Sequence, residues 1–367
     1  MRASVLRRTS SRADRPMRAW GTLPGDDPER DRAEKAAAIE AAGIDLDPPQ
    51  PGAHRHGDEG HGSEHAHPHQ HSGPGQSPII GIVGAGAVGT ALGLALSRAG
   101  WPIQAVASRD AQRRDRFRSL VEVSRVFVDP EPLLDEVELI VLAVPDDVVG
   151  PLAASLRMYS GQAMIHTSGA LGAEVLAPAM AAGTQIGAFH PLVAFADTER
   201  AVQALHGATV AIEGDDQLAT MLAEMAEAIG AHPVRLTPGS KAAYHAAAVL
   251  AAGGLVALLD AIAELGRVAG LDEAGALAIY GPLIEGTLGN ARALGIRAAL
   301  TGPVTRGDVG TLHSHLDALR AHAPSVLELY VAAARREIDL AEARRALAPE
   351  GANQMRAALT AALATPA

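Results

Sequence analysis

The sequence predicts an α/β domain followed by an all-helical domain, behind a disordered N-terminal tail. Three regimes of composition lead to this prediction. Residues 1–76 are rich in Arg, Pro, Gly, Asp and His, residues 77–236 alternate short β-branched runs with Ala- and Leu-rich runs, and residues 237–350 fit helices throughout, with a last helix or tail at 351–367. Short strands that alternate with helical stretches indicate a mostly parallel sheet covered by helices.

The overall composition excludes several classes of function. The formal net charge of −11 argues against a nucleic-acid partner, because phosphate binding needs a concentrated basic surface. The absence of cysteine excludes disulfides, thiolate catalysis and Cys-type zinc sites, and it fits a cytoplasmic protein. The longest apolar stretch, residues 242–263, contains His245 and Asp260. We interpret it as a buried helix of a soluble domain and expect no membrane partner.

The N-terminal tail has too little apolar surface to offset the entropy of ordering it, although residues 31–42 could form a short helix. It contains a run of histidines, of which His65, His67, His69 and His71 are weak candidates for binding Ni, Zn or Cu. Their spacing implies no fixed coordination geometry. We therefore favour a solvated linker with incidental affinity for divalent metal over a built metal site.

Eight strands are expected in the α/β domain. The helices between them are about 10–15 residues long, as right-handed crossovers between parallel strands require. The expected strands are residues 79–83, 103–107, 125–128, 139–144, 163–166, 185–189, 208–212 and 232–236.

A glycine-rich turn, Gly84-Ala85-Gly86-Ala87-Val88-Gly89, joins the first strand to the first helix. In this context Gly84 permits a tight turn, Gly86 lets the backbone approach a pyrophosphate, and Gly89 lets the helix pack closely on the sheet. The helix N-terminus then offers free N–H groups and its positive dipole end to the phosphates. The strand, turn and helix together predict a Rossmann dinucleotide-binding domain, with Ala87 and Val88 also at the cofactor.

The end of the second strand indicates which dinucleotide is bound. An NAD site would place Asp or Glu there for the ribose 2′-OH, whereas this sequence has Ser108 and Arg109. A serine can donate a hydrogen bond to a 2′-phosphate, and an arginine can pair with it. Asp110 is the contrary signal, and we assign it to the N-cap of the next helix. The sequence therefore favours NADP(H).

Three further loops follow strands that end at the same edge of the sheet as the glycine-rich turn. The turn at Val144 and Pro145 is expected to line the nicotinamide ribose. The loops at 166–170 and 190–192 emerge beside it, since ligands lie outside the carboxyl ends of the strands in open α/β sheets. Ser168 and His190 on these loops are candidate substrate contacts, although His190 is equally well explained as a strand-end residue.

These motifs together resemble the Rossmann-like/DUF2520 oxidoreductases over about residues 78–345. The resemblance includes the glycine-rich turn, the loops at 144–146, 166–169 and 190–192, and the later segments 241–245, 300–303 and 306–308. The wider group includes ketopantoate reductase, β-hydroxyacid dehydrogenases and pyrroline-5-carboxylate reductase. The resemblance implies that an all-helical second domain, like the C-terminal domain of 6-phosphogluconate dehydrogenase, meets the Rossmann domain and that substrate binds between the two.

Lys241, His245 and Asn290 are the candidate catalytic residues. Lys241 and His245 stand four apart near the start of a helix, so they share one face. A lysine there can polarise a carbonyl oxygen and protonate the alkoxide. In β-hydroxyacid dehydrogenases an asparagine follows the lysine at the fourth position, where this sequence has His245. A surface lysine, a core histidine and a helix-capping asparagine are the structural alternatives.

A Gly- and Pro-rich loop supplies the remaining candidate substrate contacts, Thr301, Arg306 and Asp308. Arg306 is suited to bidentate pairing with a carboxylate. Asp308 is equally well interpreted as the N-cap of the next helix. His313 and His315 stand two apart and face different sides of a helix, which makes a poor metal pair.

We expect an NADP(H)-dependent oxidoreductase that reduces the carbonyl of a small 2-oxo acid, with ketopantoate as the first substrate to test. Lys241 would be the acid, and Arg306 or the Ser168 loop would hold the carboxylate. An enzyme acting on an imine or a prephenate-like acid is the chemical alternative. A catalytically silent NADP(H)-binding sensor or scaffold is the alternative of another class. The expected partner is a second copy of the chain, because the Ala- and Gly-rich first helix of the second domain is suited to pairing.

Overall fold

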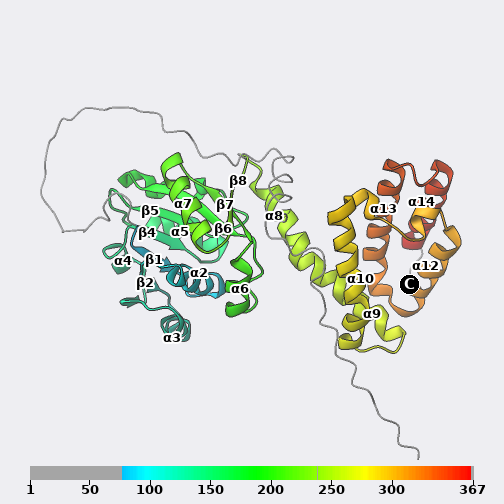
Figure 1. The fold of residues 1–367 in the computed structure, drawn as a ribbon, viewed down its shortest axis with the longest axis horizontal. Coiled ribbons are helices and arrows are strands. Elements are labelled where there is room, and N and C mark those ends of the chain that lie inside the picture. Colours follow the sequence, from blue (N-terminus) through cyan, green and yellow to red (C-terminus); the bar gives the residue numbers. More distant parts are fainter. Residues whose placement is uncertain (1–76, 238, 365–367) are drawn as a thin grey trace, which may run out of the picture. The chain divides into compact units, whose positions relative to one another are not determined.

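A computed structural model describes residues 77–237 and 239–364 (Figure 1). The chain divides into two compact units, Met1–Tyr244 and His245–Ala367, with the division inside helix α8 (Lys241–Val249). The predicted tail and its candidate metal ligands lie outside the described residues.

The first unit is an eight-stranded sheet in the order β3-β2-β1-β4-β5-β6-β7-β8. Its strands are β1 (Ile80–Val83), β2 (Ile103–Ala107), β3 (Arg125–Phe127), β4 (Leu139–Leu142), β5 (Ala163–His166), β6 (Gln185–Pro191), β7 (Thr209–Glu213) and β8 (His232–Arg235). The central strands β1 and β4 are apolar and buried throughout, as sheets covered on both faces require. The predicted α/β domain is therefore confirmed.

The mostly parallel sheet that we expected is confirmed, with one antiparallel pairing. β7 pairs antiparallel with β6, and β8 then runs parallel to β7. The chain leaves β6 at the carboxyl edge of the sheet and enters β7 from that same edge. The last two strands therefore run in the opposite direction to the others. As a result, the last residue of β7 lies beside the middle of β6.

Helices cover both faces of this sheet, and each face has its own apolar core. One core joins Leu92, Phe117 and Leu222 from three helices to the strands, and the other joins Leu133 and Leu176 to the opposite face. The helices are α2 (Ala87–Arg98), α3 (Ala111–Leu120), α4 (Glu131–Leu134), α5 (Asp146–Ser155), the 3-10 helix η1 (Ala173–Ala182), α6 (Thr198–Leu205) and α7 (Asp216–Ala228).

Aspartates set the starts of several helices. The Asp110 side chain accepts the Arg113 N–H at the start of α3, so the N-cap role predicted for it is confirmed. Asp197 and Asp215 cap α6 and α7 in the same way. Each cap satisfies an N–H group that the helix itself leaves without a partner.

The second unit is all-helical, as predicted. After α8 come the π-helical turn η2 (Leu250–Gly254), α9 (Leu255–Val268), α10 (Glu273–Leu294), α11 (Ile296–Ala299), η3 (Val304–Arg306), α12 (Val309–His322), η4 (Pro324–Val326), α13 (Leu327–Ala343) and α14 (Pro349–Ala364). Its core lies mainly among α12, α13 and α14, with Leu316, Ile338 and Leu359 buried. Because α14 belongs to this core, the helical unit extends through the boundary expected at 351.

The interpretation of residues 242–263 as a buried helix is wrong. The helical stretch Lys241–Val268 has an 18-residue window of mean hydropathy 2.1, and only 11% of that window is buried. By length and composition it could cross a membrane, a test that the core helix of a soluble protein also passes. The core of the second unit leaves much of its apolar surface uncovered, since only Ala261 of this stretch belongs to that core.

Candidate functional site

The three glycines of the glycine-rich turn occupy different environments. Gly84 has a φ of +107°, and a Cβ added there would lie 2.2 Å from the backbone oxygen of Ala143. A Cβ on Gly89 would lie 2.0 Å from the backbone oxygen of Gly84. At Gly86 an added Cβ would meet nothing within 4 Å among the described residues. Gly84 and Gly89 therefore serve the turn and its packing, while Gly86 borders open space.

This open space lies at the N-terminus of α2. Gly86 is the N-cap residue, and no described side chain caps the N–H groups of the first turn. A helix N-terminus with free N–H groups and an open approach binds phosphate through hydrogen bonds and the helix dipole. The turn therefore fits the pyrophosphate of a dinucleotide.

Arginines gather where β2 ends. Ser108 is half-buried, Arg109 is exposed, and Arg113 forms an ion pair with Asp110 at 3.4 Å. The Arg114 guanidinium donates a hydrogen bond to the Ser108 carbonyl oxygen, which places a third positive charge beside Ser108. Arg114 was not among the predicted site residues, although its position one helical turn after Asp110 could have indicated it.

A single row of paired residues links the glycine-rich turn to the far side of the sheet. Val83, the last residue of β1, pairs with Leu142, which pairs with His166 at the end of β5. His166 pairs with Ala188, and Ala188 pairs with Glu213 at the end of β7. Paired residues point to the same face of a sheet, and neighbouring strands lie about 4.8 Å apart. Glu213 thus lies level with the edge that carries the glycine-rich turn.

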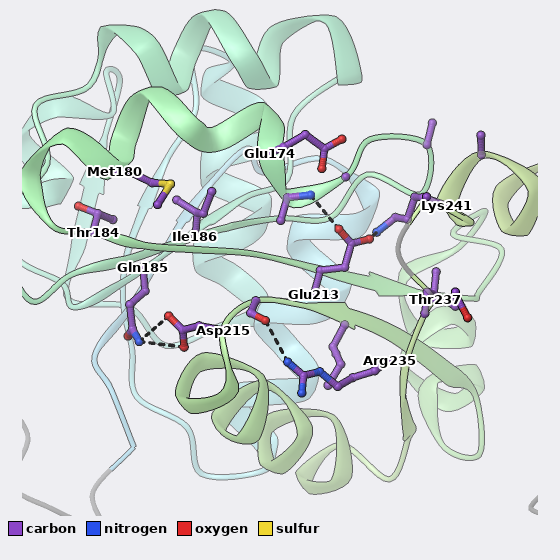
Figure 2. A pocket seen from close by; sticks show the side chains of 18 of the residues that line it. Glu174, Met180, Thr184, Gln185, Ile186, Glu213, Asp215, Arg235, Thr237 and Lys241 are labelled. Atoms are coloured by element: carbon purple, nitrogen blue, oxygen red, sulfur yellow. Dashed lines mark hydrogen bonds and ion pairs between the residues drawn. The ribbon is translucent and has the colours of Figure 1, made fainter. Parts of the chain in front are cut away.

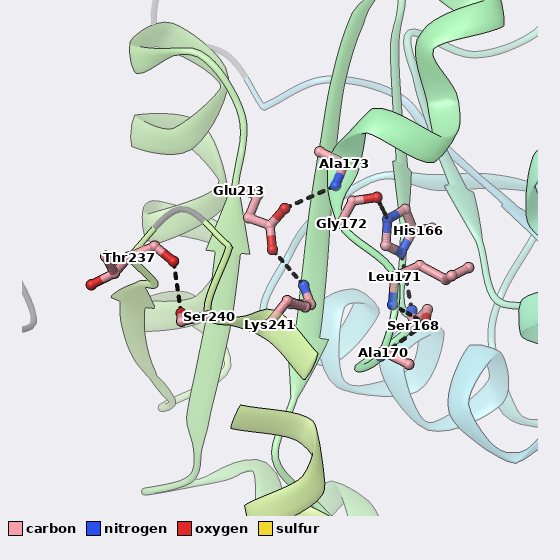
Figure 3. Close-up of polar contacts among 10 residues, drawn as sticks. All are labelled: His166, Ser168, Ala170, Leu171, Gly172, Ala173, Glu213, Thr237, Ser240 and Lys241. Atoms are coloured by element: carbon pink, nitrogen blue, oxygen red, sulfur yellow. Dashed lines mark hydrogen bonds and ion pairs between the residues drawn. The ribbon is translucent and has the colours of Figure 1, made fainter. Parts of the chain in front are cut away.

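A buried ion pair occupies the end of this row. The Lys241 Nζ lies 2.8 Å from the Glu213 Oε1, and the Ala173 N–H donates to the Glu213 Oε2 at 2.8 Å (Figure 3). Lys241 is 7% exposed, so the alternative of a surface lysine does not hold. Glu213 was not among the predicted site residues, because a strand-end glutamate gives no sign of its partner 28 residues later.

The β5–η1 loop beside this pair is closed by its own hydrogen bonds. The His166 Nδ1 accepts the Ser168 N–H at 3.2 Å, and its Nε2 donates to the Gly172 carbonyl oxygen at 3.1 Å. This pattern assigns the single ring proton of a neutral imidazole to Nε2. The Ser168 Oγ accepts the Ala170 and Leu171 N–H groups, which leaves its hydroxyl proton free to donate.

Several charged groups around His166 affect its pKa. Burial lowers the pKa of His166, and the positive charge of Lys241 acts in the same direction. The hydrogen bond to Gly172 and the negative charges of Glu213 and Asp146 oppose this effect. Asp146 directly follows Pro145, so Lys241 interacts electrostatically with the end of β5, near the turn after β4. His166, at the end of β5, is therefore close enough to both Lys241 and Asp146 to be affected by their charges.

Two family profiles match the chain. Residues 67–191 match the profile of the Rossmann-like domain, and residues 208–337 match that of a domain of unknown function, DUF2520. The chain joins a Rossmann-like domain to a DUF2520 domain. The resemblance that the sequence motifs indicated is confirmed. No functionally curated protein matches the chain.

Solved structures share this fold. A Bacteroides fragilis protein provisionally named an NADP oxidoreductase has a TM-score of 0.60 and 24% identity, over 72% of this chain and 98% of its own. A Thermotoga maritima protein has a TM-score of 0.57 and 24% identity, over 73% of this chain and 100% of its own. A reductive aminase from Aspergillus terreus, solved in complex with NADPH4, cyclohexanone and allyl amine, has a TM-score of 0.51 and 18% identity, over 79% of this chain and 94% of its own. At these identities the similarity concerns the fold.

Within the DUF2520 domain, Tyr244 lies beside His190 of β6. The two rings are 5.8 Å apart in an edge-to-face contact at 87°. Burial raises the pKa of Tyr244 to about 12, and its hydroxyl has no hydrogen-bond partner within the described ranges. Tyr244 lies in the segment 241–245 that carries the family resemblance, but it was not among the predicted site residues. His245 follows it and is half-buried, four residues after Lys241 on α8.

The other predicted site residues of the DUF2520 domain belong to the second unit. Asn290 is exposed on α10, which continues to Leu294, so Asn290 does not cap that helix. Thr301 and Arg306 are exposed. The Asp308 carboxylate accepts the Thr311 N–H at 2.9 Å and the Thr311 hydroxyl at 2.6 Å, and these bonds lower the pKa of Asp308. The structure therefore gives Asp308 the capping role, which was its alternative interpretation.

No metal site is apparent in the described part of the chain, since no three His, Asp or Glu side chains there are grouped to hold an ion. His315 instead contacts the Tyr330 hydroxyl through its Nδ1 at 2.8 Å. The weak metal candidates of the tail lie outside the described residues.

A cavity of about 1050 Å³ adjoins the Lys241–Glu213 ion pair. Lys241 and Glu213 lie at one end, and Met180, Thr184 and Gln185 lie at the other (Figure 2). The glycine-rich turn does not line it. A cavity of this size accommodates a small organic ligand.

Proposed function

We propose that the chain is an NADP(H)-dependent oxidoreductase that reduces a carbonyl group with Lys241 as the acid. The observation that carries the proposal is a buried, ion-paired lysine at the sheet edge that also carries the glycine-rich turn. Active sites of open α/β sheets lie at this edge, outside the carboxyl ends of the strands.

The proposed cofactor is NADP(H). The pyrophosphate would lie at Gly86 and the N-terminus of α2, with Ala87 and Val88 beside it. The ribose 2′-phosphate would be held by Ser108, Arg109 and Arg114. Three groups that donate hydrogen bonds, two of them cationic, suit a phosphate better than a ribose hydroxyl. Val144 and Pro145 would line the nicotinamide ribose.

The choice of lysine at position 241 supports a role in proton transfer. The chain contains 31 Lys and Arg residues in total, of which only Lys35 and Lys241 are lysines. Arginine would also pair with Glu213, but its guanidinium keeps its proton in proteins, whereas a buried lysine can release one. If the ion pair served stability alone, an arginine could replace the lysine, which this chain otherwise uses so rarely.

Bound NADPH would supply a hydride to the carbonyl carbon. The Lys241 ammonium has three donor hydrogens, of which Glu213 takes one. A second can point at the carbonyl oxygen, stabilise the negative charge that develops there and pass its proton to it. His166 is poorly suited to this step, since both its ring nitrogens are engaged within the loop.

The proposed substrate is a small 2-oxo acid, with ketopantoate first among those to test. The Ser168 hydroxyl proton is available to a carboxylate oxygen, and Arg306 is the second candidate carboxylate ligand. His190, Thr301, Asn290 and His245 stay as predicted substrate or catalytic contacts. A C=N substrate places the same demand on Lys241, because the nitrogen also takes a proton as hydride arrives.

The first experiment measures binding and turnover with the full-length protein. NADPH should bind about tenfold more tightly than NADH, since one charge-assisted hydrogen bond contributes about 1.5–3 kcal/mol. NADPH oxidation should then depend on one member of a panel of 2-oxo acids, with cyclic imines and simple ketones included. NADPH binding without turnover of any compound would favour the silent binding protein, and failure to bind NADPH would refute the proposal.

We also propose a homodimer whose interface is the apolar arm, defined as α9 and α10. The exposed large apolar side chains of the arm are Leu255, Val256, Leu258, Leu265, Val268, Leu277, Ile279, Leu283, Leu288 and Leu294. A helix that is apolar all round is normally buried, and an exposed patch of this extent marks an interaction site. Asp260 and Glu264 on α9 make a bilayer the less suitable cover, because charged side chains are costly in lipid.

The dimer predicts a specific response to charge in the apolar arm. Val256→Glu combined with Leu283→Glu should convert the protein from twice the mass of one chain to a monomer, because these side chains are 65% and 66% exposed. Size-exclusion chromatography with light scattering measures the mass. The control is Val128→Glu, which should leave the dimer intact. Val128 directly follows β3, outside the apolar arm, and its side chain is 52% exposed. A monomeric wild type would refute this interface.

A further inference from the structure

We propose that Glu213 is the positioning residue for Lys241, holding its ammonium group at the sheet edge in the protonated form that the reaction consumes. The proposal rests on the function proposed for Lys241 and adds a residue that neither the sequence motifs nor the comparisons assign. It concerns a residue that acts through Lys241 and does not touch the substrate.

Both oxygens of the Glu213 carboxylate are engaged. Oε1 lies 2.8 Å from the Lys241 Nζ, and Oε2 accepts the Ala173 N–H at 2.8 Å (Figure 3). Glu213 ends β7, Ala173 begins η1, and Lys241 begins α8. The carboxylate thus joins three elements, and the N–H bond at Oε2 fixes the direction in which Oε1 faces the ammonium.

Burial makes the carboxylate necessary for the charge of the lysine. The Lys241 side chain is 9% exposed and that of Glu213 is 23% exposed. An ammonium group removed from water without an anionic partner loses its proton more readily, because desolvation disfavours the charged form. Without Glu213, Lys241 would more often be a neutral amine, which cannot serve as the acid.

Several of the other charged groups near the pair are engaged elsewhere. Arg235 on β8 pairs with Asp216 at 3.0 Å, and Asp215 caps α7. On β5, His166 is held in its loop, as described above. Asp146 on α5 and Glu174 on η1 complete this set, and neither is in ion-pair contact with the Lys241 Nζ. Glu213 is therefore the carboxylate that directly determines the state of Lys241.

Lysine chemistry gives a readout that does not depend on turnover. Lys241 and Lys35 are the two lysines of the chain, so mass spectrometry after limited treatment with an amine-acylating reagent reports on each separately. Only the neutral amine reacts. Glu213→Gln and Glu213→Ala should raise the acylation rate of Lys241 relative to Lys35 by about tenfold, equivalent to one pH unit of titration.

A matched control is available at the opposite side of the sheet. Arg125 and Glu136 form an ion pair of the same 2.8 Å length in the same unit. Glu136→Gln should leave the acylation rate of Lys241 and the enzyme kinetics unchanged. Thermal melting of each variant separates loss of positioning from loss of folding, and Glu213→Gln retains an oxygen for the Ala173 N–H if Glu213→Ala does not fold.

The kinetic test uses the pH profile. In Glu213→Gln, kcat should fall by about tenfold or more at neutral pH with the KM for NADPH unchanged, and the alkaline limb should move to lower pH by about one unit. Glu213→Asp keeps the charge and should retain the position of the limb. Unchanged acylation and an unchanged limb in Glu213→Gln would overturn the proposal. If the wild type reduces no substrate, the proposed function fails, while the acylation rates still decide whether Glu213 controls Lys241.

Discussion

Replacing Lys241 with arginine is expected to lower kcat by about 10²- to 10⁴-fold while leaving the affinity for NADPH unchanged, which is the range that general acid catalysis contributes. Arginine keeps the positive charge and can still pair with Glu213, so the buried carboxylate stays compensated. It cannot release a proton at neutral pH, because guanidinium is effectively always protonated. The substitution therefore separates the charge of Lys241 from its proton.

The comparison with Lys241→Ala makes this result specific. Alanine leaves the Glu213 carboxylate without its ion-pair partner at 2.8 Å, so it should lower the melting temperature as well as kcat, since an uncompensated buried group costs about 1–3 kcal/mol. Lys241→Arg should melt close to the wild type. Lys35→Arg is the control, because it also removes one of the two lysines of the chain. It should leave kcat and the melting temperature unchanged. Full activity of Lys241→Arg would show that Lys241 is not the acid.

The glycine-rich turn could be predicted from the sequence because its requirements are local. A strand, a turn and a helix within 20 residues determine the roles of Gly84, Gly86 and Gly89, and an added Cβ meets the surroundings that those roles imply. The N-cap role of Asp110 is local in the same sense, since its carboxylate binds an N–H three residues later. The same locality made the strand positions predictable from their apolar runs.

Glu213 could not be predicted in this way. Its contact with Lys241 depends on β7 running antiparallel to β6, and that polarity depends on where the chain re-enters the sheet after α6. Strand periodicity carries no information on direction. The exposure of the stretch Lys241–Val268 was missed for a related reason, because apolar composition predicts burial without saying whether the same chain or another one provides the cover.

The three glycines of the turn should respond differently to the same substitution. Gly86→Ala should leave the melting temperature unchanged, because its φ of −77° suits any residue and the new Cβ enters open space. The same Cβ would occupy the approach to the N–H groups of α2, so NADPH affinity should fall by about tenfold or more, as expected when a phosphate loses a charge-assisted hydrogen bond. Loss of binding without loss of stability is the signature of a ligand-facing glycine.

Gly89→Ala should instead lower both the melting temperature and the affinity for NADPH. Its Cβ would lie 2.0 Å from a backbone oxygen, so the turn must move, at a cost of more than about 3 kcal/mol as overpacking against rigid atoms implies. Gly310→Ala, where the nearest atom would lie at 3.7 Å, is the control and should change neither. Isothermal titration with NADPH and thermal melting of the three variants provide the data. Wild-type affinity in Gly86→Ala would show that the cofactor does not approach the backbone closely at Gly86.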